Sequence, residues 1–270
     1  MIVLAYMFNV FKTTTDFCLA SRNKKFHDYI ATRNWTDETI QQFKIGYFPP
    51  SLLSLKVKVT NDGGEYEDLI EGGIVKDSWS IFSDRIIFPI WDQWGEEIAI
   101  TGRVLDEKKK PKYFNTFYEK GKTLYGLNFA IDEIVRTKRV YVWEGNADVV
   151  TSHQFGLKNA VGCQGTAFSE DHFILLSRYA EEIILVFDND NGGKKALYSF
   201  NKRKIEEDKK ETRVYRCMFK NHKDADEFLN KEGKDRLIDY MNNQINSSTT
   251  QYRLKNIQAV QNNGKKIPVR

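Results

Sequence analysis

The pattern of apolar and polar residues changes character near the middle of the chain. From Tyr125 onward, short apolar runs alternate with segments whose apolar residues recur at helical spacing. Such alternation predicts a parallel sheet covered on both faces. Ser169 is a good N-cap for one of the helices. We expect strands in RVYVWE (139–144), KNAVGC (158–163), IILVFDND (183–190) and RVYRCM (213–218), and helices in LYGLNFAIDEIV (124–135), ADVVTSHQFG (147–156), SEDHFILLSRYA (169–180) and from about residue 193.

The first part of the chain has a mixed pattern. Residues 23–50 predict one or two helices, the second of which begins after Thr36 as its N-cap and is stopped by the proline pair at 49–50. The polar, glycine-containing stretch 60–79 predicts loops and short strands. Residues 85–105 alternate around a glycine turn and predict a hairpin.

Together these patterns predict an α/β protein with three parts. A mixed α+β subdomain occupies residues 1–134, a parallel-sheet subdomain residues 135–239, and a flexible tail residues 240–270. With 270 residues, of which 41% are hydrophobic, the chain can bury a sizeable core, so a disordered protein is excluded. Its three cysteines lie far apart and contain no CxxC pair, which excludes a disulfide scaffold.

The longest apolar stretch opens the chain and is too short to span a bilayer. It also lacks the positive flank of a signal peptide. We therefore expect a cytoplasmic protein with no membrane contact. The four histidines show no metal-ligand spacing, and we expect them to be surface or satisfied core residues.

Positive charge is concentrated in two segments, although the formal net charge is only +4. Residues 103–122 hold seven basic and three acidic side chains, and residues 241–270 hold five basic side chains and no acidic one. A solvated loop and a soluble tail explain this pattern. A ridge that faces nucleic-acid phosphates explains it equally well, because lysine and arginine supply affinity there without reading sequence.

Acidic residues follow two of the predicted strands. Glu144 and Gly145 end one strand, and Asp188 and Asp190 end another. A single acid at such a place is usually a helix cap or a solvated turn residue. Three carboxylates converging at the carboxyl edge of a sheet repel one another unless a divalent cation lies between them, and oxygen ligands suit Mg²⁺ or Mn²⁺.

At these acids the sequence resembles the TOPRIM fold, whose signature is a strand-ending Glu followed on a later strand by Asp-x-Asp. From about residue 23 to 237 it resembles, more narrowly, the RNA polymerase domain of bacterial DnaG-type primases. The matching stretches occur in the family's order: TDETIQQFKIGYFPP, RIIFPIWDQWG, TGRVLD, PKYFNT, KGKTLYGLNFA, EGNADVV, GCQGTAF, FDNDNGG and KDADEF.

The resemblance assigns roles to matching residues of this chain. It implies that Glu144 is the catalytic carboxylate and that Asp188 and Asp190 are the main metal ligands. Asp148 and two acids near residue 225 would extend the metal and nucleotide site. The resemblance also implies a surface for template and incoming nucleotide. The acids near residue 225 are Asp224 and Asp226, and the surface residues that the resemblance assigns are Arg103, Lys112 and Lys120. We add Asn115 to this surface and Tyr113, for which core packing and stacking on a template base are the two alternatives.

The activity implied is synthesis of short RNA primers on single-stranded DNA, from ribonucleoside triphosphates and with two or more Mg²⁺ or Mn²⁺ ions. The family's N-terminal zinc-binding domain has no counterpart in this sequence. We therefore expect no zinc in the chain, a compact phage-like form, and a replicative helicase or separate template-recognition protein as partner. A TOPRIM nuclease and a non-catalytic DNA-binding accessory protein are the alternatives. The primase-specific run from PKYFN to KGKTLYGL argues against the first, and the intact acid set argues against the second.

Overall fold

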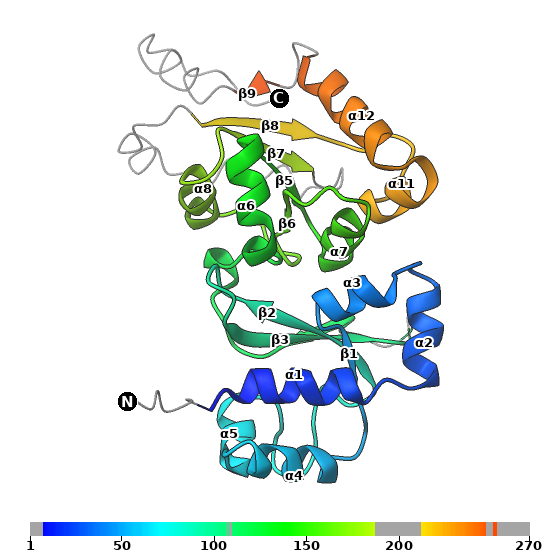
Figure 1. The fold of residues 1–270 in the computed structure, drawn as a ribbon, viewed down its shortest axis with the longest axis vertical. Helices are drawn as coiled ribbons and strands as arrows, with labels where there is room; N and C mark the ends of the chain where they lie inside the picture. Colours follow the sequence, from blue (N-terminus) through cyan, green and yellow to red (C-terminus); the bar gives the residue numbers. More distant parts are fainter. Residues whose placement is uncertain (1–7, 107, 109, 187–211, 247–250, 253–270) are drawn as a thin grey trace, which may run out of the picture. The chain divides into compact units, whose positions relative to one another are not determined.

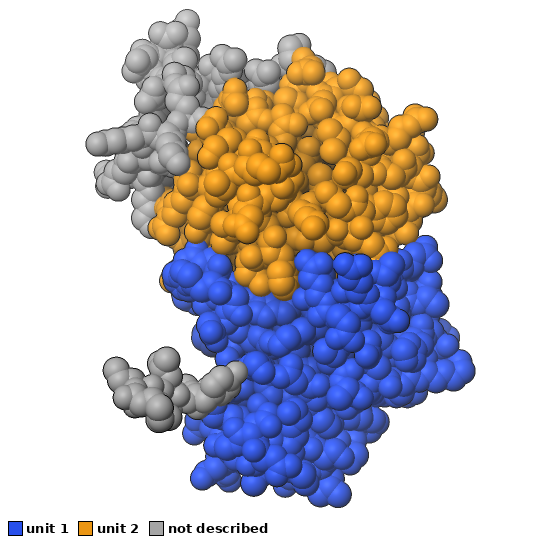
Figure 2. All heavy atoms as spheres, in the orientation of Figure 1, with its two compact units in different colours: residues 1–119 blue, residues 120–270 orange. Residues whose placement is uncertain are grey.

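The computed structural model of the chain describes residues 8–106, 108, 110–186, 212–246 and the backbone of 251–252. The chain forms two compact units, residues 1–119 and residues 120–270 (Figure 2). Each unit has its own sheet (Figure 1).

The first unit is built on an antiparallel sheet with strand order β1-β2-β3-β4. Its strands are β1 (Gly46–Phe48), β2 (Arg85–Trp91), β3 (Glu97–Val104) and β4 (Tyr113–Asn115), and its helices are α1 (Val10–Ala20), α2 (Lys24–Ala31), α3 (Asp37–Gln42), α4 (Leu53–Asn61) and α5 (Tyr66–Glu71). The predicted hairpin is the β2–β3 pair. The hydrophobic core joins one face of this sheet to α1, α4 and α5.

Helix α1 lies directly against β1. A Cβ atom at Gly46 would come within 2.4 Å of the carbonyl carbon of Cys18, so only glycine permits this approach. Asn9 caps the helix by accepting hydrogen bonds from two backbone N–H groups.

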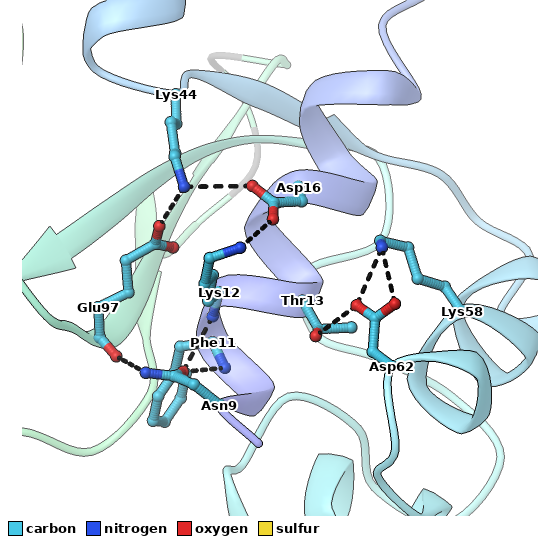
Figure 3. Close-up of polar contacts among 9 residues, drawn as sticks. All are labelled: Asn9, Phe11, Lys12, Thr13, Asp16, Lys44, Lys58, Asp62 and Glu97. Atoms are coloured by element: carbon cyan, nitrogen blue, oxygen red, sulfur yellow. Dashed lines mark hydrogen bonds and ion pairs between the residues drawn. The ribbon is translucent and has the colours of Figure 1, made fainter. Parts of the chain in front are cut away.

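A series of ion pairs links α1 to the first residue of β3 (Figure 3). Lys44 Nζ lies 2.6 Å from Glu97 Oε1 and 3.2 Å from Asp16 Oδ1, and Lys12 Nζ lies 2.8 Å from Asp16 Oδ2. The Glu97 side chain is 4% exposed and that of Lys44 29%. These ion pairs therefore lie at the margin of the core rather than in open solvent.

Two sequence-based predictions for this unit were wrong. The helix that begins after Thr36 ends at Gln42, and the prolines at 49–50 follow β1 instead of stopping a helix. Residues 66–71 of the predicted loop region form α5, because Leu69 is fully buried and the Asp68 carboxylate accepts a hydrogen bond from the Glu65 backbone N–H at the helix start.

The second unit is built on a five-stranded sheet with strand order β6-β5-β7-β8-β9. Strands β5 to β8 are parallel and β9 is antiparallel. The described elements are η1 (Lys120–Lys122), α6 (Leu127–Thr137), β5 (Arg139–Trp143), α7 (Asn146–Gln154), β6 (Ala160–Gly162), α8 (Glu170–Ser177), β7 (Glu182–Val186), β8 (Arg213–Cys217), α11 (Ala225–Glu232), α12 (Lys234–Asn246) and β9 (Gln251–Tyr252). The predicted α/β class, with a parallel sheet in the second part of the chain, is confirmed.

Helices cover both faces of this sheet (Figure 1). On one face, α6 and α8 pack against the valines, leucines and isoleucines of the central strands. On the other face, Tyr141 and Trp143 of β5 stack in a series of aromatic rings that continues through Phe219 to Tyr240 of α12. Both faces being buried explains the nearly continuous apolar character of the strands.

The units divide at a different place from the predicted boundary near residue 134. Leu127, Ala130 and Ile134 of α6 belong to the same core as the parallel strands, which places this helix in the second unit. Helix α12 runs past residue 240, where the tail was predicted to begin, because Met241 and Ile245 are buried. The helix predicted from about residue 193 lies outside the described residues. Within the described part of the chain, no helix combines the length and the apolar character needed to cross a bilayer.

Candidate catalytic edge of the parallel sheet

Glu144 lies at the carboxyl edge of the parallel sheet, at the point where the strand order reverses. The chain passes from β5 to its neighbour β6 on one side and then crosses to β7 on the other. Glu144 directly follows β5, and Asp188 follows β7 by two residues in the sequence. In open α/β sheets, ligands bind at the carboxyl ends of the strands beside this reversal.

The turn after Glu144 brings a second carboxylate to the same place. Asp148 lies in the first turn of α7, and a Cβ atom at Gly145 would stand only 2.9 Å from its Oδ2 atom. Glycine at 145 therefore lets the Asp148 carboxylate approach the backbone of the turn. This explains why the sequence places a glycine directly after the strand-ending acid.

Asp226 is held against this turn from a neighbouring helix. Its backbone N–H donates to Asp148 Oδ1 at 3.0 Å, and its own Oδ1 accepts a short hydrogen bond from the Thr151 hydroxyl. The Asp224 carboxylate accepts from the Glu227 N–H at 2.9 Å and caps α11. The structure thus brings Asp148 and Asp226 together, whereas Asp224 serves as a helix cap.

The oxygen donors at this edge have the chemistry that a hard divalent cation requires. Among the described residues, no three His, Cys, Asp or Glu side chains form a group arranged to hold a metal ion. Asp188 and Asp190, which are predicted to complete the site, lie outside the described residues. The predicted metal site therefore fits the described residues in part, through Glu144 and Asp148.

A tight turn fixes the backbone beside Glu144. Gln164 and Gly165 both have positive φ angles, 59° and 71°, and the Thr166 N–H donates to the Cys163 carbonyl at 3.1 Å. The Gly165 N–H donates to the Glu144 carbonyl at 2.9 Å. This turn is part of the GCQGTAF stretch, to which sequence reasoning assigned no role beyond the resemblance.

Three of the predicted nucleic-acid residues share one face of the antiparallel sheet in the first unit. Arg103 pairs with Tyr113 across strands β3 and β4, and Thr101 pairs with Asn115, so these side chains lie on the same side. The hydroxyl of Thr101 donates to Asn115 Oδ1 at 2.7 Å. Lys112 directly precedes β4 and is partly buried.

Arg103 is a packed residue rather than a free surface cation. It is 4% exposed, and its Nη1 donates to the Tyr29 hydroxyl at 3.0 Å. Its guanidinium carbon lies 5.1 Å from the Tyr29 ring centre and 5.9 Å from that of Tyr113. Tyr29 was missed by sequence reasoning, because nothing in a helix-forming segment indicates an arginine partner 74 positions away.

Lys120 belongs to the second unit, where it begins η1. Its side chain is partly buried, and this burial lowers the pKa of the ammonium group. A partly desolvated cation gains more from an anionic ligand than a fully hydrated one.

Comparison with known proteins extends over both units. Residues 15–131 match the family described as "DNA primase catalytic core, N-terminal domain", and residues 141–229 match the family described as "Toprim-like". The DNA primase of Clostridium acetobutylicum is 33% identical over 259 residues, covering 92% of this chain and 42% of that protein. This chain belongs to the DnaG-type primase family.

Solved primase structures agree with this membership. A DnaG catalytic core superposes with a TM-score of 0.75 at 27% identity, covering 87% of this chain and 80% of that one. A DNA primase domain from Pseudomonas aeruginosa gives a TM-score of 0.74 at 30% identity, covering 87% and 78%. A DnaG primase catalytic domain bound to single-stranded DNA gives 0.71 at 27% identity, covering 87% and 80%. The chain spans less than half the length of the curated primases it matches.

Proposed function

We propose that this chain synthesises short RNA primers on single-stranded DNA by metal-dependent nucleotidyl transfer during DNA replication. The observation that carries the proposal is the position of Glu144 at the strand-order reversal of a sheet that matches the Toprim-like family. The match of the first unit to the primase-specific N-terminal domain supports primer synthesis over the cleavage chemistry of other TOPRIM enzymes.

In the proposed reaction, the 3′-hydroxyl of one ribonucleotide attacks the α-phosphorus of the next. A new phosphodiester bond forms, the bond to the β-phosphate oxygen breaks, and pyrophosphate leaves with the electron pair. Mg²⁺ or Mn²⁺, when bound by Glu144, Asp188 and Asp190, would lower the pKa of the hydroxyl and neutralise charge on the phosphates. Glu144 acts in this account either as a metal ligand or as the general base.

In the proposal, Asp148 lies at the metal site itself, whereas Asp224 and Asp226 act on it indirectly. Asp148 shares the turn with Glu144 and adds negative charge at the metal site. Asp226 orients Asp148 through its backbone N–H, and Asp224 fixes the start of α11 on which Asp226 lies. Helix α11 thus helps to hold the Asp148 carboxylate in place at the proposed catalytic edge.

In the proposal, Lys112, Tyr113 and Asn115 of the first unit contact nucleic acid, with Arg103 packed against Tyr29 and Tyr113. Separately, Lys120 of the second unit binds nucleotide. These residues would hold template and triphosphate, which positions the reacting groups without taking part in bond making. The likeness to a primase catalytic domain bound to single-stranded DNA supports such a template. A replicative helicase or a separate template-recognition protein, and action at a replication fork in the cytoplasm, complete the proposal.

The test is a primer-synthesis assay on single-stranded DNA with labelled ribonucleotides and Mg²⁺ or Mn²⁺. Wild type and Glu144→Gln are compared, with Glu133→Gln as the matched control on a partly exposed helix position of the same unit. The proposal predicts short RNA from wild type and Glu133→Gln but none from Glu144→Gln, with single-stranded DNA binding intact in all three. Normal synthesis by Glu144→Gln would contradict it, and metal-dependent DNA cleavage without RNA would favour a nuclease.

A further inference from the structure

Helix α8 begins against the turn that carries Lys120, and three carbonyl groups of this turn face its first residues. The Ser169 hydroxyl donates to the Gly121 carbonyl. His172 Nε2 lies 2.8 Å from the Lys120 carbonyl oxygen and 3.2 Å from that of Thr123. The η1 turn is therefore bound to α8 through its backbone.

The hydrogen bonds around His172 determine its tautomer. The imidazole is fully buried, and the Ser169 backbone N–H lies 3.2 Å from Nδ1 as a donor. Nδ1 must therefore accept, and the proton lies on Nε2, which donates to the two carbonyls of the turn. The neutral imidazole thus completes the capping box of α8 through Nδ1 and binds the η1 turn through Nε2.

A second set of contacts links the same turn to the catalytic edge. The Gln164 side chain donates to the Thr123 carbonyl at 3.3 Å, and the adjacent Gly165 N–H donates to the Glu144 carbonyl at 2.9 Å. Cys163 Sγ lies 4.0 Å from His172 Nδ1. The loop 163–166 therefore connects the backbone of Glu144 with the turn that His172 holds.

We propose that His172 is a positioning residue for primer synthesis, which fixes Lys120 relative to Glu144 through the carbonyls of the 120–123 turn. This inference rests on the proposed function, because it acts through the nucleotide-binding role proposed for Lys120. His172 itself contacts neither substrate nor metal. Without its Nε2 donor, the Lys120 and Thr123 carbonyls each lose one hydrogen bond and keep only those from the Thr123 N–H and from Gln164, which lets the turn shift.

The decisive variants are His172→Phe, which keeps a ring but removes both nitrogens, and His172→Gln, which keeps an amide donor near the position of Nε2. The matched control is His153→Phe. His153 is also buried, and its Nε2 lies 2.9 Å from a backbone carbonyl, which is that of Ala160 and not one of the 120–123 turn. A general loss of packing would affect both sites alike.

In the primer assay, His172→Phe is expected to raise KM for ribonucleoside triphosphates about tenfold or more, with a smaller change in kcat, since a misplaced binding group costs this much. His172→Gln recovers part of the loss, and His153→Phe keeps the wild-type KM. In a Lys120→Met background, His172→Phe adds no further effect. Additive effects, or a wild-type KM in His172→Phe, would overturn the inference.

A second readout does not depend on activity. Lysine acetylation followed by mass spectrometry reports the reactivity of Lys120, with exposed Lys138, which lies outside the 120–123 turn, as internal reference. His172→Phe is expected to raise the relative reactivity of Lys120 severalfold, and His153→Phe to leave it unchanged. If wild type makes no RNA, the proposed function fails, while unchanged Lys120 reactivity in His172→Phe refutes the positioning role on its own.

Discussion

Two pairs of carboxylates, one pair in each unit, are held in opposite ways. In the first unit, Asp16 and Glu97 meet the ammonium groups of Lys12 and Lys44 (Figure 3). In the second unit, the carboxylates of Asp148 and Asp226 accept hydrogen bonds from a backbone N–H and a hydroxyl, which are uncharged donors. Ion pairing cancels charge and joins helix to sheet. Uncharged donors orient a carboxylate and leave its negative charge in place, which a cation site requires.

The first prediction tests whether charge at Asp148 matters for activity. Asp148→Asn keeps a carbonyl oxygen for the Asp226 N–H but removes the negative charge. We expect the Mg²⁺ concentration needed for primer synthesis to rise about 10–100-fold, with little change in melting temperature. A metal titration of the primer assay measures this. Asp16→Asn is the control, and an unchanged titration for Asp148→Asn would remove Asp148 from the proposed metal site.

The second prediction separates the units by their response to acid. Burial lowers the pKa of His153 from 6.5 to about 4, and it lowers the pKa of His172 as well. The folded second unit therefore binds fewer protons than the unfolded one, so stability present above pH 6.5 is lost as the pH falls toward 4. For His153 alone the loss amounts to about 3 kcal/mol.

In the first unit, the contribution of Asp16 to stability changes at a lower pH. Although burial alone would raise its pKa, hydrogen bonds from Lys12 and Lys44 bring the pKa below the ordinary 3.8. The stability it contributes is present above pH 3.8 and is lost only below that value. Hydrogen exchange, corrected for its intrinsic pH dependence, is expected to show the second unit opening first between pH 6 and 4. Simultaneous opening of both units, or no change on His153→Gln, would contradict this order.

The third prediction removes the cation from the first unit's ion pairs. In Lys44→Met, the buried carboxylate of Glu97 loses its ion-pair partner, and its Oε2 atom already has no hydrogen-bond partner among the described residues. We expect a loss of about 2 kcal/mol in the free energy of unfolding, measured by urea denaturation. The double variant Lys44→Met/Glu97→Met should recover much of this loss. A double variant less stable than Lys44→Met would show that Glu97 stabilises the unit by other means.

The smallest effect is expected where α1 meets the end of α4. The buried Thr13 hydroxyl donates to Asp62 Oδ2 at 2.8 Å, and Lys58 binds the same carboxylate (Figure 3). Thr13→Val removes the donor at nearly constant volume and should cost about 1 kcal/mol by urea denaturation. Thr13→Ser retains the hydroxyl and serves as the control. Equal losses in both variants would assign the effect to packing instead.

Local signals predicted much of the second unit. Apolar runs bounded by turn residues located its parallel strands, and Ser169 and Thr36 are confirmed as N-caps. The strand that ends just before Glu144 followed from the same pattern. The roles of the site residues stay predictions, and Asp188 and Asp190 lie outside the described residues.

The remaining features depend on contacts between residues far apart in the sequence. Lys44 and Glu97 are separated by 53 positions, and His172 and the Lys120 carbonyl by 52. No local pattern reveals such pairs. Helix α5 was missed because its only fully buried residue, Leu69, gives too weak a periodic signal. The capping residues Glu65 and Asp68 at its start are a helix signal that the sequence does contain.

The most direct test of the account measures melting temperature and primer synthesis on the same samples of Glu144→Gln and Glu97→Gln. The account predicts that Glu144→Gln melts like wild type and makes no RNA. It predicts that Glu97→Gln melts at a lower temperature but makes primers at temperatures where it is folded. Primer synthesis by Glu144→Gln at the wild-type rate would contradict the central claim that the carboxyl edge of the parallel sheet is the catalytic site.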